Sequence, residues 1–363
     1  MVLAPLVALA LAAAPAEAGR LPPPPREIYT IAWAKRLVPT EFGDFQTQEL
    51  GGVAVDPTGQ WVVVGTRDGW LHALHADGRL AWDFQGRGPF AGQPLIDGGV
   101  AYAGCHDGKL YALDLATGAV RWTYDAREQL ATRPALVKGL VVVASLQDTV
   151  FAVDAATGAW RWHHRRDLND GFTILGAASV QVDGGHVYAA YSDGTVTALE
   201  AGTGEVRWEQ HVAPSGRYQD VDSLSLGDGR LFLAAYSGAI MALDPASGKT
   251  LWSQPFPEAE RVLASRGAVL AVTGREVVSL SETDGQANWK VPMQGAPSGM
   301  LAVAGPWLLV PANDGGLRIH EAASGRLFRV LDTGAGIAAT PGVLGRRAYI
   351  LSNAGTLLAI DFD

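Results

Sequence analysis

One unit recurs along this chain and limits what the chain can fold into. A short apolar segment leads to an acidic residue, then to Thr-Gly or Ser-Gly, and a Trp follows four residues after the Gly, as in 104–122 (GCHDGKLYALDLATGAVRW). The turn glycines are spaced by 37 to 46 residues and are Gly78, Gly118, Gly158, Gly204, Gly248, Gly285 and Gly325. A period near 40 with four short strands per unit is typical of a β-propeller.

The N-terminal segment can supply the missing end of the last unit. The final half copy (LAIDFD) stops at Asp363 without a Trp, whereas 31–35 resembles an outer strand with Trp33 in the repeat position. We expect this strand to complete the C-terminal blade, because that leaves no open edge between the first and last blades. The sequence therefore predicts an all-β, eight-bladed β-propeller of four-stranded antiparallel blades over residues 31–363.

The repeat Trp is expected to be a packing residue. Seven of the 11 Trp occupy the repeat position: Trp33, Trp82, Trp122, Trp162, Trp208, Trp252 and Trp289. The eighth position holds Arg329, beside Phe328. Each buried Trp removes on the order of 200 Å² from water, so a wedge between neighbouring sheets explains the spacing better than seven ligand platforms. The recurring acids, such as Asp114, are expected to accept hydrogen bonds from their own turns.

The N-terminus predicts export. Residues 1–14 are apolar and lead to Ala16-Glu17-Ala18, a small-x-small cleavage site, although no Lys or Arg precedes them. We therefore expect a signal peptide over 1–18, a Pro-rich linker over 19–30, and a periplasmic monomer that is at most peripheral to a membrane. A net charge of −9 with no long basic run argues against nucleic-acid binding. Cys105, the one cysteine, cannot form an intrachain disulfide and is expected to be a buried, inert thiol.

Two stretched repeats indicate a binding face. The repeat spacing grows to 46 and 44 residues between Trp162, Trp208 and Trp252, and the extra residues fall in 163–176 (HHRRDLNDGFTILG) and 209–223 (EQHVAPSGRYQDVDS). Both are expected to connect an outer strand to the next inner strand, on one face of the disc, where insertions tend to bind partners. The adjacent His163 and His164 are predicted to lie in a solvated loop, since neighbouring residues on an extended chain chelate one metal poorly.

The repeat, A-[LV]-D-x-x-T-G-x-x-x-W, resembles that of the pyrroloquinoline quinone (PQQ) propeller superfamily. The resemblance covers nearly the whole chain and implies the fold. Dehydrogenases of that superfamily hold the quinone against a disulfide between adjacent cysteines, with Ca²⁺ and an Asp base. One cysteine excludes that disulfide, and no group of oxygen ligands stands out as a calcium cage. We therefore predict no cofactor, no metal and no catalytic residues, and keep a PQQ-dependent periplasmic dehydrogenase as an alternative.

A second stretch resembles one particular family. Tyr218 to Asp222 (YQDVD), followed by a strand pair containing AYSG and ALD, is similar to a blade of BamB, the propeller subunit of the outer-membrane β-barrel assembly machinery. This resemblance implies a non-catalytic exported scaffold in the periplasm, with the inner face of the outer membrane as its expected place of association. A sensor or adhesion propeller with another partner is a further alternative.

The resemblance also implies which residues contact the barrel-assembly subunit (a BamA-like partner). The acids are Asp220 and Asp222, and the apolar stretch is Phe172 to Leu175, with Phe172 and Ile174 as apolar contacts. Two features depart from the family. Leu175 stands where the family has Arg, and no cysteine follows the apolar N-terminal run to accept a lipid. For the two acids, the alternative role is capping of their loop.

Overall fold

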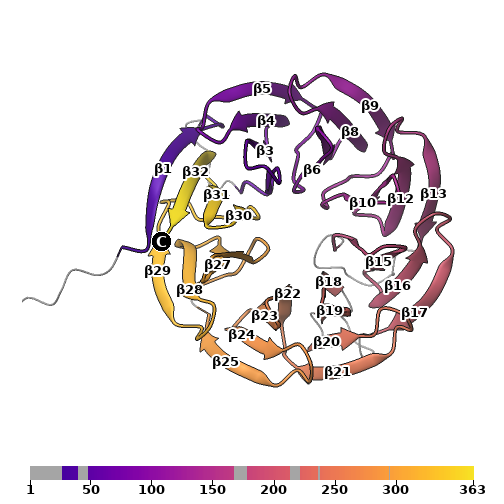
Figure 1. The fold of residues 1–363 in the computed structure, drawn as a ribbon, viewed down its shortest axis with the longest axis vertical. Coiled ribbons are helices and arrows are strands. Elements are labelled where there is room, and N and C mark those ends of the chain that lie inside the picture. Colours follow the sequence, from indigo (N-terminus) through magenta and orange to yellow (C-terminus); the bar gives the residue numbers. More distant parts are fainter. Residues whose placement is uncertain (1–26, 40–47, 167–177, 213–220, 236–237, 294) are drawn as a thin grey trace, which may run out of the picture.

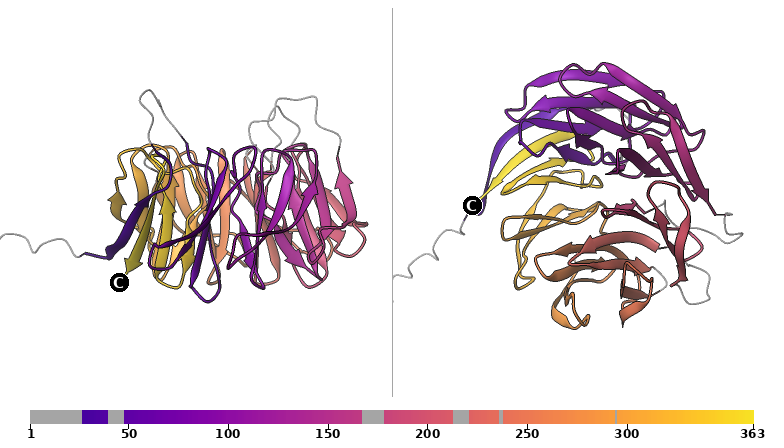
Figure 2. Two further views of the ribbon diagram at one scale, coloured as in Figure 1. Left: turned by 90° about the horizontal axis from the view of Figure 1, so that it is seen from above. Right: turned by 45° about the vertical axis from the view of Figure 1, so that its right-hand side comes forward.

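A ring of eight four-stranded antiparallel sheets forms the molecule, as predicted (Figure 1). The computed structural model describes residues 27–39, 48–166, 178–212, 221–235, 238–293 and 295–363. The expected signal peptide and most of the linker lie outside these ranges. Seen from the side the ring is a disc, with all strands running between its two faces (Figure 2).

Each of the first four blades uses four consecutive strands, from the axis outward. Blade 1 is β2 (Val53–Val55), β3 (Trp61–Gly65), β4 (Trp70–His75) and β5 (Leu80–Gln85). Blade 2 is β6 (Leu95–Asp97), β7 (Val100–Gly104), β8 (Lys109–Asp114) and β9 (Val120–Asp125). Blade 3 is β10 (Ala135–Val137), β11 (Leu140–Ala144), β12 (Thr149–Asp154) and β13 (Trp160–Arg165). Blade 4 is β14 (Gln181–Val182), β15 (His186–Ala190), β16 (Thr195–Glu200) and β17 (Val206–His211).

The next three blades repeat this order, and the last is closed by the N-terminal strand. Blade 5 is β18 (Val221–Gly227), β19 (Arg230–Ala235), β20 (Ala239–Leu243) and β21 (Thr250–Pro255). Blade 6 is β22 (Ala259–Ser265), β23 (Ala268–Thr273), β24 (Glu276–Ser281) and β25 (Ala287–Pro292). Blade 7 is β26 (Ala302–Ala304), β27 (Trp307–Ala312), β28 (Gly316–Glu321) and β29 (Leu327–Leu331). Blade 8 is β30 (Gly342–Leu344), β31 (Arg347–Leu351) and β32 (Thr356–Phe362), with β1 (Tyr29–Arg36) outermost.

The predicted ring closure is confirmed. β1 pairs antiparallel with β32, from Tyr29 opposite Phe362 to Arg36 opposite Thr356. The strand starts two residues before the expected start of the propeller. A register shift between Ile31 and Trp33 repeats the one found just before the Trp position in every other outer strand. β1 therefore shares both the pairing and the β-bulge of the other outer strands. A bulge of this kind changes the direction of the side chain next to it, here that of Trp33.

The repeat Trp is the wedge between blades that the spacing predicted. Trp82, on the outer strand of blade 1, donates its Nε1–H to the carbonyl of Leu115 at 2.8 Å. Leu115 lies in the β8–β9 turn of the next blade, blade 2. A Cβ on Gly118 of that turn would lie 2.7 Å from the Trp82 ring, and its φ is +73°. Only glycine fits both the close approach and the left-handed backbone. The same pair of contacts recurs for the other six repeat Trp.

The structure also explains why one blade lacks this Trp. The outer strand of blade 7, β29, would dock on a turn joining the last two strands of blade 8. That turn does not exist, because β32 and β1 belong to the two ends of the chain. Phe328 of β29 packs instead on Trp307, with ring centroids 5.2 Å apart. Arg329 therefore stands where no glycine turn is available for a Trp to cover.

The inner strands differ in length. Pro94, Pro134 and Pro341 precede β6, β10 and β30, which have three residues each, and a residue without an N–H cannot extend the ladder. β2, β14 and β26 follow no such proline and are no longer than these, whereas β18 and β22 have seven residues each. These two strands lie against each other, and Ser223 Oγ accepts a hydrogen bond from the Val262 N–H at 3.1 Å.

Candidate interaction site and axial channel

The two stretched connections have other limits than the sequence suggested. His163, His164 and Arg165 belong to β13, so they do not form the predicted solvated loop. Likewise 209–211 belong to β17 and 221–223 to β18. The connections between blades 3 and 4 and between blades 4 and 5 are therefore 166–180 and 212–220. The error arose because polar residues on the solvent side of an outer strand look like loop residues in a sequence.

Arg166 fixes the point where the first connection leaves blade 3. Its Nε lies 2.8 Å from Asp193 and its Nη1 2.7 Å from Glu209, both in blade 4. Its guanidinium carbon also lies 5.8 Å from the centre of the Tyr191 ring. Burial alone would lower the pKa of Arg166, but the two carboxylates raise it. Repeat analysis did not single out this residue, although it joins the two blades from which the stretched connections start.

The neighbouring His164 is also held in this network. Its Nδ1 lies 2.8 Å from the Tyr191 hydroxyl. Burial, and then the positive charge of Arg166, lowers the pKa of His164. His163 lies instead beside Phe151 and Trp160. Within the part of the chain that the structure describes, no group of three His, Cys, Asp or Glu side chains is placed to hold a metal ion.

Of the five residues predicted to contact a partner, one is described. Phe172, Ile174, Leu175 and Asp220 lie outside the described residues. Asp222 lies at the start of β18, in a register shift between Val221 and Ser223, and is 9% exposed. It is thus a strand residue lining the axial channel rather than an exposed loop residue. The role of all five as partner contacts stays a prediction.

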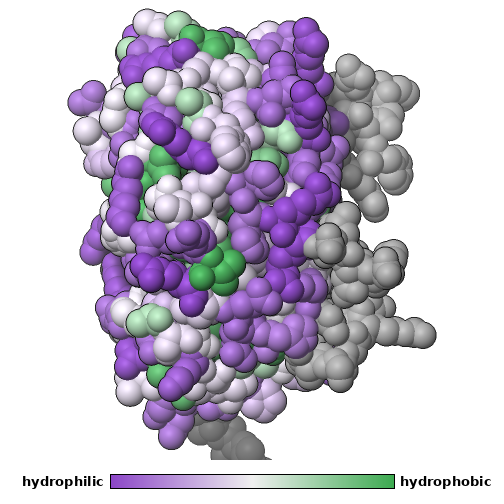
Figure 3. All heavy atoms as spheres, turned by 90° about the vertical axis from the view of Figure 1, so that its right-hand side faces the viewer, coloured by the Kyte–Doolittle hydropathy of each residue, from purple (hydrophilic) through white to green (hydrophobic). Residues whose placement is uncertain are grey.

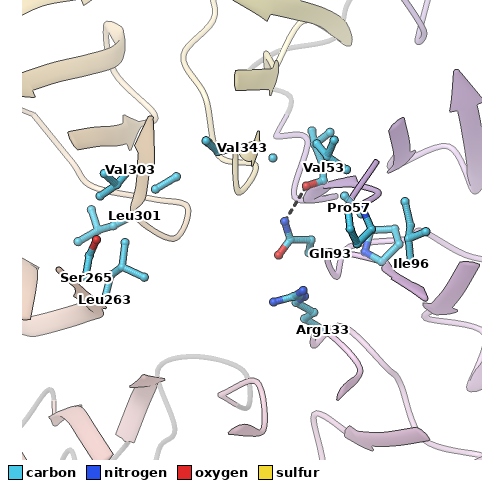
Figure 4. Close-up of a pocket in the computed structure, with 15 residues that line it drawn as sticks. Val53, Pro57, Gln93, Ile96, Arg133, Leu263, Ser265, Leu301, Val303 and Val343 are labelled. Carbon is cyan, nitrogen blue, oxygen red and sulfur yellow. Dashed lines mark hydrogen bonds between the residues drawn. The ribbon is translucent and has the colours of Figure 1, made fainter. Parts of the chain in front are cut away.

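The axial channel contains two cavities. The connection-side cavity, of about 510 Å³, opens between the strand-to-strand connections that join successive blades, and Asp222 is one of its lining residues. The turn-side cavity, of about 470 Å³, lies toward the opposite face, where Pro57 in the turn after β2 and Ser265 at the end of β22 are among its lining residues. Gln93 and Arg133 line both cavities (Figure 4).

The rim of the disc is mainly polar. On the side of blades 2 to 4, Figure 3 shows separate hydrophobic spots rather than one continuous patch. The exposed apolar residues of these outer strands include Val120, Trp160 and Val206, one on each strand. Scattered single residues of this kind are usual on soluble proteins.

Cys105 is a core thiol, as predicted. It is buried, and its Sγ donates to the carbonyl of Gly88 at 3.1 Å. Burial raises the pKa of Cys105 to about 12, so the thiolate that reacts with oxidants and electrophiles is scarcely formed. Across the described ranges, no helix is long and apolar enough to cross a bilayer.

The family model and a curated relative name the same family. The family model described as "Outer membrane protein assembly factor BamB" matches residues 30–114, 97–275 and 273–363. A curated protein of that name from Legionella pneumophila is 25% identical over 180 residues, which cover 47% of each chain. The matched part thus spans about half the length of this relative.

Solved structures share the fold. The crystal structure of BamB from Moraxella catarrhalis superimposes with a TM-score of 0.79 at 23% identity, covering 92% of this chain and all of that one. A quinohemoprotein alcohol dehydrogenase from Comamonas testosteroni reaches a TM-score of 0.73 at 15% identity, covering 92% of this chain and 76% of that one. At these identities the superpositions show the architecture only.

Proposed function

The chain belongs to the family described as outer membrane protein assembly factor BamB, and from this we propose that it is a non-catalytic scaffold that binds partner proteins during assembly of outer-membrane β-barrel proteins. The observation that carries the proposal is the family match, which extends over the whole ring rather than over a few blades. The proposed partner is the barrel-forming assembly subunit, of the BamA type. The proposed location is the periplasm, at the inner face of the outer membrane.

We place the docking surface on the face that carries the two stretched connections. Arg166 anchors the first connection through Asp193 and Glu209, so its chain direction at residue 166 is fixed by blade 4. The proposed contacts are Phe172, Ile174 and Leu175 in that connection and Asp220 and Asp222 at the end of the next. In such a contact, the apolar anchor supplies affinity and the surrounding charges fix how the partner is oriented.

Co-purification tests the proposed site. Asp220→Ala/Asp222→Ala should abolish recovery of the barrel-assembly subunit with the tagged, full-length protein. Because Asp222 is largely buried, Asp222→Asn is tested alongside, and unfolding midpoints show whether each variant is folded. The matched control is Asp77→Ala/Asp97→Ala, which removes two exposed carboxylates from turns on the opposite face. Equal recovery from the test and control variants would remove the site assignment.

The dehydrogenase alternative has less support. Its structural neighbour is 15% identical and so shares the fold alone. The residues also fit a quinone site poorly, because the one cysteine is buried and its thiol is bonded to Gly88. Purified protein supplied with PQQ and Ca²⁺ should give no dye reduction with alcohols or sugars, and substrate-dependent reduction would favour the enzyme. Cross-linking in the cell envelope separates the proposed scaffold from a sensor or adhesion protein by identifying the captured partner.

A further inference from the structure

Each blade has one residue, within its inner strand or one or two positions before it, that faces the axis at the same level of the channel. In every blade, the third residue of the second strand pairs with one inner-strand residue, for example Tyr102 with Leu95 and Val142 with Ala135. The residue two positions earlier points to the same side of the strand. These eight positions are Gly52, Gln93, Arg133, Ser179, Ser223, Arg261, Met300 and Thr340. Seven of them line the connection-side cavity.

Most polar members of this axial ring bond to the neighbouring inner strand. Gln93 donates from Nε2 to the carbonyl of Val53 at 2.6 Å (Figure 4). Ser179 Oγ accepts from the Arg133 N–H at 3.1 Å, and Thr340 Oγ1 accepts from the Met300 N–H at 3.3 Å. The contacts of Gln93, Ser179 and Thr340 join neighbouring inner strands. Arg261 instead donates to the carbonyl of Glu260 in its own strand at 2.9 Å.

The guanidinium of Arg133 is different. Among the described residues it has no ion pair, and its side-chain nitrogens have no hydrogen bond. It reaches into the middle of the channel beside Gln93 (Figure 4). The surrounding protein lowers the pKa of Arg133, and no carboxylate contributes to that shift. A guanidinium carries five N–H donors in a fixed fork that matches a carboxylate. Five donors facing an open cavity between protein walls therefore form a site for an anion.

The charges around Arg133 favour an anion on the turn side. Asp222 is the acidic residue among those lining the connection-side cavity, which also contains Arg261 and His106. No acidic residue is among those lining the turn-side cavity. Beyond Arg133, that cavity is lined by Gln93 and Ser265 and by apolar residues. Of the apolar residues, Val55, Leu263, Val303 and Val343 are half-buried, whereas Val53, Ile96 and Leu301 are buried. A charge on one side and a few half-buried apolar side chains on the other define an amphipathic site.

From this arrangement we propose that the axial channel binds a monocarboxylate that carries a short apolar group. The carboxylate takes the fork of Arg133, and the apolar group fills the turn-side cavity. One guanidinium balances one negative charge, whereas a dianion would lose more hydration free energy than a single ion pair returns. A volume of about 470 Å³ suits a small molecule or the last residues of a peptide. The inference is independent of the partner contacts proposed above.

Titration of the full-length protein tests this site. The probes are hexanoate, its uncharged analogue hexanamide, and acetate, which lacks the apolar group; N-acetylglycyl-leucine represents a peptide C-terminus. By calorimetry or chemical-shift perturbation, hexanoate should saturate one site, and hexanamide and acetate should bind at least tenfold more weakly. Saturation by hexanoate alone assigns a free acid as the ligand. Saturation by the peptide, with or without hexanoate, assigns a chain terminus.

Variants decide whether Arg133 is the receptor. Arg133→Gln should weaken binding of the saturating probe at least tenfold, and Arg133→Lys should restore part of it. The matched control, Arg121→Gln, removes the same charge from the rim, where Arg121 is paired with Asp114 at 2.8 Å, and should bind as the parent does. Because Arg133 makes no described side-chain bond, Arg133→Gln should unfold at the same denaturant concentration as the parent or a higher one. Unchanged binding in folded Arg133→Gln, equal binding of hexanamide, or no saturable binding of either acid would overturn the proposal.

Discussion

Glu282 is an acid in a place where the repeat has small or apolar residues. Its backbone carbonyl accepts the Nε1–H of Trp252 at 2.9 Å, the role played elsewhere by Leu115, Ala155 and Ala201. The side chain is 5% exposed and meets Asp228 of blade 5. Burial first, and then the hydrogen bond and charge of Asp228, raise the pKa of Glu282 to about 7. Glu282 is therefore expected to weaken the fold whenever it is ionised.

The sign and size of this effect follow from proton linkage. A carboxyl group whose pKa is raised in the folded state stabilises the fold fully only below its unfolded pKa, here 4.5, and this stabilisation is lost as the pH rises through about 7. Each tenfold change in proton affinity is worth about 1.4 kcal/mol, so the loss is at most about 3 kcal/mol. Glu282→Gln keeps the shape and removes the charge. Its advantage over the parent should grow by about 1–3 kcal/mol between pH 4.5 and pH 8.

Urea unfolding followed by Trp fluorescence at several pH values measures this advantage. Glu282→Ala introduces the residue that most other blades have at this position. Its difference in unfolding free energy from the parent should depend on pH in the same way, but should be shifted by a constant amount at every pH. Asp228→Asn should reduce the dependence, because it removes the second carboxyl of the pair. The control is Glu205→Gln, at an exposed position in the corresponding turn of blade 4. A difference between Glu282→Gln and the parent that stays constant from pH 4.5 to pH 8 would refute the reasoning.

Two further predictions concern the ring itself. Trp82→Ala should cost about 3–5 kcal/mol in urea unfolding, since it leaves a cavity at the blade 1–blade 2 contact and a carbonyl without its donor. Arg329→Trp should give no matching gain, because no glycine turn faces that position; a gain above about 1 kcal/mol would contradict this account of the wedge. Deleting 1–36 should expose the edge of β32 and remove the Trp33 wedge, so size-exclusion chromatography should show association or loss of folded protein. A monomer with the parent's unfolding midpoint would show that closure does not depend on β1.

The ring could be predicted from the sequence because packing repeats with the blades. Each Trp needs a glycine turn in the next blade, so both residues recur at the same spacing and are visible without a structure. The same logic predicted β1 from Trp33 alone. The strand limits at 163–165 and 221–223 could not be predicted so well, because alternating exposure on an outer strand and a polar start to an inner strand both look like loops.

The axial positions escaped sequence analysis for the opposite reason. The packing positions are constrained by the core of a neighbouring blade and therefore repeat. An axial side chain borders the channel, and it can differ from blade to blade even where it bonds to a neighbouring inner strand. Gln93, Arg133 and Ser179 occupy equivalent places and share no chemistry. Because these positions differ in every repeat, they do not appear in a repeat pattern. They become a set only when the strands are arranged around one axis. This chain and a dehydrogenase superimpose over most of their shared fold. Where two propellers are this similar, any difference in activity must come from residues that packing does not constrain. In this chain those residues are the axial ring and the connections between blades. Binding experiments directed at Arg133 and at Asp222 therefore test residues whose identity the fold does not determine.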